Sequence, residues 1–458
     1  MNQEIYDNSD TICAISTPGG VGGIAVIRVS GADAVPVVSK IWKGAKIDLF
    51  KSHTAHLGQL FDPESGDVID EVVLTIFRSP NSFTGETVIE LGVHGSTWIQ
   101  GRVVQLLSEA GARLALPGEF TRRAFLNGKI DLAEAEAVGD LIASQSKSAH
   151  RLAISQLKGA FSKRIDSLRD ELLQLACLME LELDFAEEEV EFASRDKLRS
   201  LTTAIVDEVG KLASSFRRGN AIKRGIPVAI IGATNAGKSS LLNELLEENR
   251  AIVSSIHGTT RDVIEDVVTI KDFMVRFMDT AGLRKTDDEI EQLGIERSRV
   301  VADKASIVLN VIDASSPVYP EVESIDSRYI FVINKRDIVP VDQIVKFVQE
   351  HYPSNKIIAI TTNSTKDIEM LRELLFETLR AEMTDNNEVT VTNERHAQAL
   401  FAAANHLQAL LANLDAGIPT DLLAQDLRDA ISTLSSITGQ ITTPTILNQI
   451  FANFCIGK

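Results

Sequence analysis

The segment from Val228 to Asn243, VAIIGATNAGKSSLLN, constrains the fold of this chain more than any other. An apolar run typical of a buried strand leads into GATNAGKS, which matches the phosphate-binding pattern GxxxxGK[ST], and we expect a helix from about Lys238. Gly232 and Gly237 let backbone N–H groups converge on one anion, and the helix N-terminus adds positive charge. Lys238 can reach the β- and γ-phosphates, and the Ser239 hydroxyl can ligate Mg²⁺.

Length and composition limit the class of protein. The chain has 458 residues, 44% of them hydrophobic and 24% charged, which suits about three globular domains. No apolar run approaches the ~20 residues of a membrane-spanning helix, and the acidic start MNQEIYDNSD does not resemble a signal peptide. Three widely spaced cysteines predict neither a disulfide framework nor a zinc site, so we expect a cytoplasmic protein. A net charge of −18 argues against a generic surface for polyanions.

The sequence pattern changes along the chain and predicts a multidomain α/β plus α architecture. Residues 1–118 contain short apolar strands separated by glycine, proline and asparagine, which indicates a mixed α/β domain. Residues 119–217 and 380–458 carry apolar side chains at helical spacing, as in a helical bundle. Residues 218–379 contain nearly continuous apolar runs, typical of a mostly parallel sheet buried on both faces. The simplest arrangement inserts this last domain into the helical domain.

Two further motifs follow predicted strands where a guanine-nucleotide domain requires them. In Asp279-Thr280-Ala281-Gly282 the aspartate can hold a water of the Mg²⁺ shell, and the glycine N–H can meet the γ-phosphate. In Asn334-Lys335-Arg336-Asp337 the last carboxylate can accept from both N1–H and the 2-amino group of guanine, while Asn334 and Lys335 would brace the loop and cover the base. Adenine offers no such donor pair and would leave the carboxylate unpaired, so GTP is favoured over ATP.

Two other segments complete the expected nucleotide site. A threonine hydroxyl of Gly258-Thr259-Thr260-Arg261-Asp262 can join the Mg²⁺ shell once a γ-phosphate is bound. Thr361-Thr362-Asn363 follows the last predicted strand and could meet the base through its backbone, although Ser-Ala-Lys would be more usual there. We therefore expect GTP to contact Asn235, Ala236, Gly237, Lys238, Ser239, Ser240, Ser254, Ser255, Ile256, His257, Gly258, Thr259, Thr260, Asp279, Thr280, Ala281, Gly282, Asn334, Lys335, Asp337, Thr361, Thr362 and Asn363.

The motifs GxxxxGKS, TTRD, DTAG and NKRD, in this order, resemble those of the translation-factor-like GTPases and imply a Ras-like P-loop domain. Those enzymes normally use a glutamine after the DxxG glycine, whereas this chain has Leu283. The segment DTAGLRKTDDEIEQLGIER is similar to that of the tRNA wobble-uridine 5-carboxymethylaminomethyl modification GTPases. The resemblance covers nearly the whole chain and includes GGIAVIRVSG, NSFTGETVIELGVHG, LPGEFTRRAFLNGKIDLAEAEAVGDLI and the terminal FCIGK, and a generic GTPase needs neither of the last two.

The resemblance implies an activity and partners. That family hydrolyses GTP and, with a flavin-containing partner, adds an aminomethyl or carboxymethylaminomethyl group at C5 of uridine 34 in tRNA. The one-carbon unit would come from 5-formyl- or methylene-tetrahydrofolate bound by the N-terminal domain, with ammonium or glycine as amine donor. The partner would be obligatory because nothing in this sequence resembles a flavin site. A homodimer and a heterotetramer or larger complex with the partner are also implied.

The resemblance also implies how metal ions and catalysis are arranged. Mg²⁺ would have two protein ligands, Ser239 and Thr260. K⁺ would occupy the place of an arginine finger, and its ligands would be Asn235, Ser254, Ile256 and Thr259. Glu291 aligns with the catalytic glutamate that orients or activates the attacking water in place of the missing glutamine.

The resemblance assigns the two ends of the chain to a folate site. The family's folate ligands correspond to Arg28, Glu90, Lys129 and Lys458. A carboxylate fits the donor-rich pterin ring, and cations fit the glutamate tail. Cys455 would be catalytic as a nucleophile or thiol participant, although its thiolate character depends on surroundings that the sequence does not reveal. The apolar residues Ile450, Phe451 and Phe454 should be packed.

Two alternatives stay open at the level of sequence. The GTPase motifs also suit a switch that binds ribosomal RNA or assembly intermediates without modifying RNA, but such a switch needs neither a folate pocket nor the FCIGK tail. The basic cluster Arg217, Arg218, Lys223 and Arg224 lies beside a predicted domain junction, where it could contact RNA or stabilise a hinge.

Overall fold

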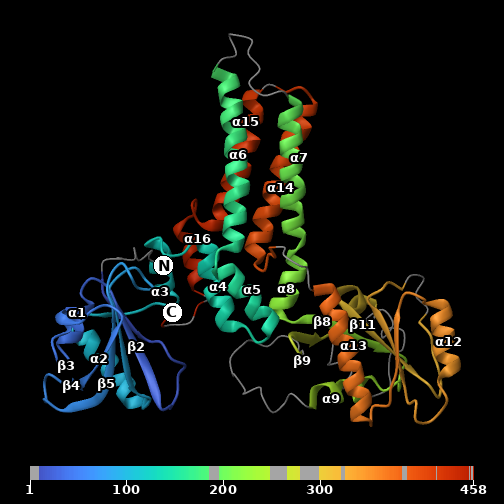
Figure 1. The fold of residues 1–458 in the computed structure, drawn as a ribbon, viewed down its shortest axis with the longest axis horizontal. Helices are drawn as coiled ribbons and strands as arrows, with labels where there is room; N and C mark the ends of the chain where they lie inside the picture. The colour runs from blue at the N-terminus through green and yellow to red at the C-terminus, as the bar shows by residue number, and fades with distance from the viewer. Residues whose placement is uncertain are drawn as a thin grey trace. The chain divides into compact units, whose positions relative to one another are not determined.

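The computed structural model describes residues 10–184, 195–247, 266–278, 299–320, 325–383, 389–418, 420–452, 454 and 457. The chain divides into two compact units. The first comprises Met1–Ile142, Ser155–Ile205 and Ala402–Lys458, and the second comprises Ala143–Ile154 and Val206–Phe401. Each unit holds one β-sheet together with helices (Figure 1). Within the described ranges, no helix has the length and apolarity needed to cross a membrane.

The sheet of the first unit has seven strands in the order β3-β4-β5-β6-β2-β1-β7. The strands are β1 (Ile12–Ile15), β2 (Ile24–Ser30), β3 (Trp42–Lys43), β4 (Thr54–Phe61), β5 (Val68–Phe77), β6 (Val88–His94) and β7 (Arg113–Leu114). Neighbouring strands are antiparallel except β1 and β7. The sheet is thus mainly antiparallel, and α1 (Ala34–Ser39) and α2 (Thr97–Glu109) pack on its apolar face. The short 3₁₀ turn η1 (Ile47–Leu49) packs there too.

Helices fill the segments where helical spacing predicts them. Along the chain they are α3 (Glu119–Leu126), α4 (Leu132–Ala143), α5 (Lys147–Leu157), α6 (Ala160–Asp184), α7 (Arg195–Ser214), α8 (Phe216–Arg224), α14 (Glu394–Asp415), α15 (Thr420–Thr438) and α16 (Pro444–Phe451). In the first unit α6 and α15 lie side by side (Figure 1). Their predicted apolar stripes are buried: Leu168, Leu172, Leu175 and Met179 on α6, and Leu423, Leu427, Ala430, Leu434 and Ile437 on α15.

The sheet of the second unit has six strands in the order β13-β12-β11-β8-β10-β9. They are β8 (Ile226–Gly232), β9 (Asp266–Ile270), β10 (Phe273–Phe277), β11 (Ile307–Asp313), β12 (Tyr329–Asn334) and β13 (Lys356–Ala359). All neighbours are parallel except β9 and β10, which confirms the mostly parallel sheet. β10 and β9 lie on one side of β8, and β11, β12 and β13 lie on the other. The carboxyl end of β8 is therefore a topological switch point, where such sheets bind ligands.

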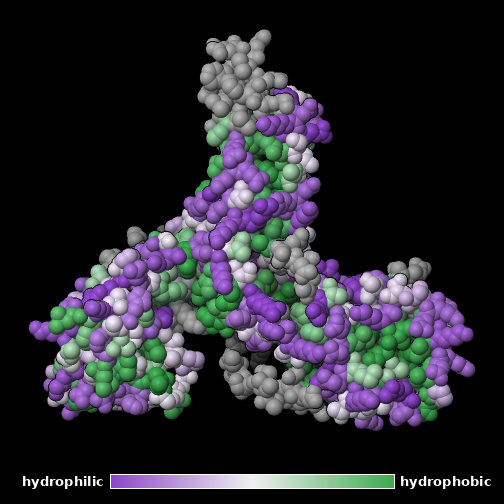
Figure 2. Space-filling view, in the orientation of Figure 1, coloured by the Kyte–Doolittle hydropathy of each residue, from purple (hydrophilic) through white to green (hydrophobic). Residues whose placement is uncertain are grey.

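Both faces of this second sheet are covered by helices, which explains the apolar character of its strands. Side chains of α9 (Lys238–Glu247) and α13 (Thr365–Met383) share one core cluster with the sheet, and α12 (Asp342–His351) packs on another. Hydrophilic residues lie on the outer sides of α12 and α13, with apolar residues visible between them (Figure 2). Because helices cover both faces of the sheet, the polar loops that could bind a ligand lie at the carboxyl ends of its strands.

Candidate functional site

The phosphate-binding loop connects the carboxyl end of β8 to the first residue of α9, as predicted. Gly232 has φ of 145° and Gly237 has φ of 96°, both in the region that favours glycine. A Cβ atom on Gly232 would lie 2.2 Å from the Val311 carbonyl oxygen, and one on Gly237 would lie 2.1 Å from Asn334 Nδ2. The exposed Asn235 has φ of 64°, a conformation that asparagine tolerates better than most residues. The loop is therefore a tight backbone cradle that excludes side chains at both glycines.

Lys238 lies across this cradle. Its Nζ donates to the carbonyl oxygens of Gly232, at 2.9 Å, and Ala233, at 2.7 Å. Burial lowers the pKa of Lys238, because the charged ammonium loses water. The two carbonyl oxygens compensate the positive charge of Lys238 only in part, whereas a phosphate oxygen carries the negative charge needed to compensate it. The loop therefore fits an anionic ligand. Ser239, half-buried, and Ser240, exposed, follow in the first turn of α9.

The loop after β12 is joined directly to the phosphate-binding loop. Asn334 is 1% exposed; its Nδ2 donates to the Ala236 carbonyl oxygen at 3.0 Å, and its Oδ1 accepts from the Lys335 N–H at 2.8 Å. Lys335 has φ of 64°, and its Nζ pairs with Asp313 Oδ2 at 2.5 Å. Burial alone would raise the pKa of Asp313, but the hydrogen bonds from Lys335 and Ser315, with the Lys335 charge, together lower it. Asn334 therefore fixes the spacing between the two loops.

The remaining base-loop residues lie at the same edge of the sheet. Asp337 is exposed at the end of its loop, and the backbone N–H of Arg336 donates to the Ile360 carbonyl oxygen at 3.2 Å. Thr361-Thr362-Asn363 begins at the residue after Ile360, so the two loops expected to hold the base are neighbours. The sequence interpretation missed Asp367, a fully buried carboxylate that contacts both loops.

Several predicted site residues lie outside the part of the chain that the structure describes. They are Ser254, Ser255, Ile256, His257, Gly258, Thr259, Thr260, Asp279, Thr280, Ala281, Gly282 and Glu291. Their roles toward the γ-phosphate, Mg²⁺, K⁺ and the attacking water stay predictions.

Arg28 and Glu90 of the expected folate site face each other across β2 and β6. The register pairs these two residues, and the Arg28 Nε and Nη2 atoms donate to Glu90 Oε1 at 2.9 and 2.8 Å. The Arg28 guanidinium also lies 5.5 Å from the centre of the Phe120 ring. Both charged side chains keep about a quarter of their surface exposed, so a ligand could reach them. Lys129 is exposed and donates to the Pro80 carbonyl oxygen at 3.0 Å.

The C-terminal tail reaches this pair of residues. The Gly457 carbonyl oxygen accepts from Ser16 Oγ at 3.0 Å and from Arg28 Nη1 at 3.4 Å. Gly457 is buried with φ of 92°, and a Cβ atom there would lie 2.2 Å from the Ile15 carbonyl oxygen. The predicted packing before the tail is confirmed, because Ile450, Phe451 and Phe454 join one apolar cluster. Cys455 and Lys458 lie outside the described residues.

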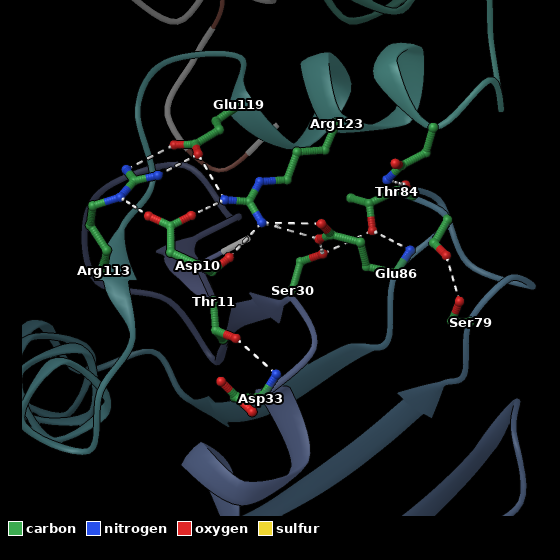
Figure 3. A network of polar contacts seen from close by, with 12 residues as sticks. Asp10, Thr11, Ser30, Asp33, Ser79, Thr84, Glu86, Arg113, Glu119 and Arg123 are labelled. Atoms are coloured by element: carbon green, nitrogen blue, oxygen red, sulfur yellow. Dashed lines mark hydrogen bonds and ion pairs between the residues drawn. The ribbon is translucent and has the colours of Figure 1, made fainter. Parts of the chain in front are cut away.

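A buried ion-pair network supports α3, the helix that carries Phe120 (Figure 3). Arg123 is 1% exposed and pairs with Asp10 at 2.5 Å, and with Glu86 and Glu119 at 3.1 Å each. Arg113 of β7 pairs with the same Asp10 and Glu119. Burial alone would raise the pKa of Glu119, but its hydrogen bonds, first of all to Arg113, lower it. These compensated charges hold α3 against the sheet on which Arg28 lies.

The order of the strands, the glycine cradle and its link to an NKRD loop define a P-loop protein of the GTPase class. The family model described as "MnmE helical domain" matches residues 132–455, and the one described as "GTP-binding protein TrmE N-terminus" matches residues 11–129. The chain belongs to the family of the tRNA modification GTPase MnmE, which confirms the resemblance found in the sequence.

Curated relatives match over their whole length. The tRNA modification GTPase MnmE of Flavobacterium johnsoniae is 45% identical over 466 residues, covering 98% of this chain and 100% of the relative. That of Parabacteroides distasonis is 47% identical over 463 residues, again covering 98% and 100%. Among solved structures, the G domain of the T. maritima FeoB iron transporter matches 33% of this chain and 97% of its own chain at 22% identity, with a TM-score of 0.26.

Proposed function

We propose that this chain is a GTP-hydrolysing enzyme of tRNA modification. The observation that carries the proposal is the hydrogen bond from Asn334 to Ala236, which couples a guanine-selecting loop to a phosphate cradle. Asp337, at the end of that loop, would accept from N1–H and the 2-amino group of guanine. The tRNA substrate is proposed from the relatives, which are named as tRNA modification GTPases.

Residues of the phosphate-binding loop and its surroundings would carry hydrolysis. The Lys238 ammonium would bind the β- and γ-phosphates, whose negative charge would offset the burial that lowers its pKa. Ser239 and Thr260 would hold Mg²⁺, which supplies neutralising charge. Asn235 with Ser254, Ile256 and Thr259 would hold K⁺, and Glu291 would orient the attacking water.

The modification chemistry is proposed for the N-terminal sheet and the tail. Arg28, Glu90, Lys129 and Lys458 would bind a tetrahydrofolate one-carbon donor, and Cys455 would take part in transfer. The contact of the Gly457 carbonyl oxygen with Arg28 supports this proposal, because it brings the chain end to the Arg28–Glu90 pair. A homodimer of the chain would work in the cytoplasm with a flavin-containing partner to modify C5 of uridine 34.

The proposal is tested by nucleoside analysis of tRNA from cells that lack this chain. The C5-modified wobble uridine should disappear and return when the wild-type gene is restored. Unchanged modification in the lacking cells, together with intact GTP hydrolysis by the purified chain, would favour the alternative of an assembly switch that binds RNA without modifying it.

The potassium proposal predicts a specific salt effect on hydrolysis. GTP turnover should be faster in K⁺ than in Na⁺ at equal ionic strength, because a fitted cation would neutralise charge between the β- and γ-phosphates. Asn235→Ala should remove the difference, while Thr234→Ala, at the exposed neighbouring position, serves as a control in the same loop. Equal rates of the wild-type chain in both salts would refute the K⁺ site.

A further inference from the structure

One buried acid outside the recognised motifs joins the two loops expected to hold guanine. Asp367 lies in the first turn of α13 and is 0% exposed. Its Oδ1 accepts from Arg336 Nη2 at 2.5 Å, and its Oδ2 accepts from the Thr361 backbone N–H at 2.8 Å. The two carboxylate oxygens thus bind one residue from each loop. A carboxylate is also favoured at this end of a helix.

The connection completes a series of contacts along the NKRD loop. Asn334 is bound to the phosphate-binding loop, Lys335 is bound to Asp313, and Arg336 is bound to Asp367. The fourth residue, Asp337, is exposed and is the one expected to meet the base. The first three side chains therefore hold the loop that carries Asp337.

We infer that Asp367 is a positioning residue for guanine recognition. It acts through Arg336 and Thr361, keeping the Asp337 carboxylate at the distance from the second loop that a guanine ring requires. Arg336 is 41% exposed while Asp367 is wholly buried, so the arginine is drawn to the interior by this carboxylate. The charge-assisted hydrogen bond is stronger than a neutral one and fixes the planar guanidinium in one orientation. The inference rests on the proposed function, because it assumes that the site binds GTP.

A comparison of the binding of GDP with that of inosine diphosphate (IDP) separates a positioning role of Asp367 from a general contribution to stability. Inosine diphosphate keeps N1–H but lacks the 2-amino group of guanine, so Asp337 can make only one of its two hydrogen bonds with it. If Asp367 positions Asp337, its loss must weaken GDP binding more than IDP binding. A loosened domain would instead weaken both nucleotides by the same factor.

The test measures GDP and IDP affinity of the full-length chain by competition with a fluorescent guanine nucleotide. Asp367→Asn keeps the shape and one acceptor but loses the charge; we expect GDP affinity to fall about tenfold and the GDP-to-IDP ratio to fall about threefold. Arg336→Gln, at a partly exposed position, should act likewise, and the double variant should add little to either. Asp342→Asn is the matched control, because Asp342 is an exposed acid in the first turn of α12.

The outcomes distinguish this inference from the proposed function. An unchanged GDP-to-IDP ratio in Arg336→Gln, in a chain whose wild type prefers GDP, would overturn the role of Asp367 and leave the GTPase proposal standing. Equal losses of both nucleotides in the two variants would also overturn it. A wild-type chain that binds no guanine nucleotide would overturn both proposals. Because Arg336→Gln changes a partly exposed residue, the test holds even if Asp367→Asn fails to fold.

Discussion

Replacing Gly237 with alanine should slow GTP hydrolysis by about 100-fold or more. The new Cβ atom would lie 2.1 Å from Asn334 Nδ2, at a backbone φ of 96° that alanine rarely adopts. Relief requires movement of either the cradle or Asn334, and both would break the hydrogen bond between the two loops. Because misplacing reacting groups by ~1 Å costs on the order of 100-fold, we expect kcat/KM for GTP to fall by at least that factor.

Gly210→Ala is the matched control for this change. Gly210 lies within α7, and a Cβ atom there would meet nothing within 4 Å. Alanine in a helix interior should stabilise the chain by about 0.5–1 kcal/mol and leave hydrolysis unchanged. Near-normal turnover by Gly237→Ala would show that the cradle does not hold the triphosphate.

The local parts of the nucleotide site could be predicted because each depends on a short segment. The phosphate-binding loop and the adjoining parts of β8 and α9 lie within sixteen residues, from Val228 to Asn243. The buried parallel strands appear as continuous apolar runs. β9 and β4 were not predicted, because apolar and polar residues are mixed in both. The two-residue strands β3 and β7 were not predicted either, because they are too short to show a pattern.

The contacts that organise the site could not be predicted because they join distant residues. The bond from Asn334 to Ala236 spans 98 positions, and that from Arg28 to Gly457 spans 429. The pairing of Arg28 with Glu90 depends on the register of β2 and β6, since a shift of one residue would place them on opposite faces. Asp367 has no motif, and only the packing of α13 against two loops reveals it.

Replacing Gly457 with alanine should strongly reduce wobble-uridine modification while GTP hydrolysis continues. A Cβ atom on Gly457 would lie 2.2 Å from the Ile15 carbonyl oxygen, and its φ of 92° is unfavourable for alanine. The end of the tail must then leave β1, so Ser16 and Arg28 lose the carbonyl oxygen that they bind. Because positioning of reacting groups contributes factors of ~100, we expect the modified nucleoside to fall at least tenfold in complemented cells.

Gly101→Ala separates this effect from a general response to alanine. Gly101 lies in α2 of the same unit, and a Cβ atom there meets nothing within 4 Å, so modification should be normal. The purified Gly457→Ala chain should hydrolyse GTP at the wild-type rate, because the changed contacts belong to the first unit and the phosphate-binding loop belongs to the second. Normal tRNA modification by Gly457→Ala would mean that the contacts of Gly457 with Ser16 and Arg28 are not needed for the transfer chemistry. Loss of modification with intact hydrolysis would instead assign the tail to the transfer chemistry. A simple assembly switch does not require separate sites for hydrolysis and for transfer.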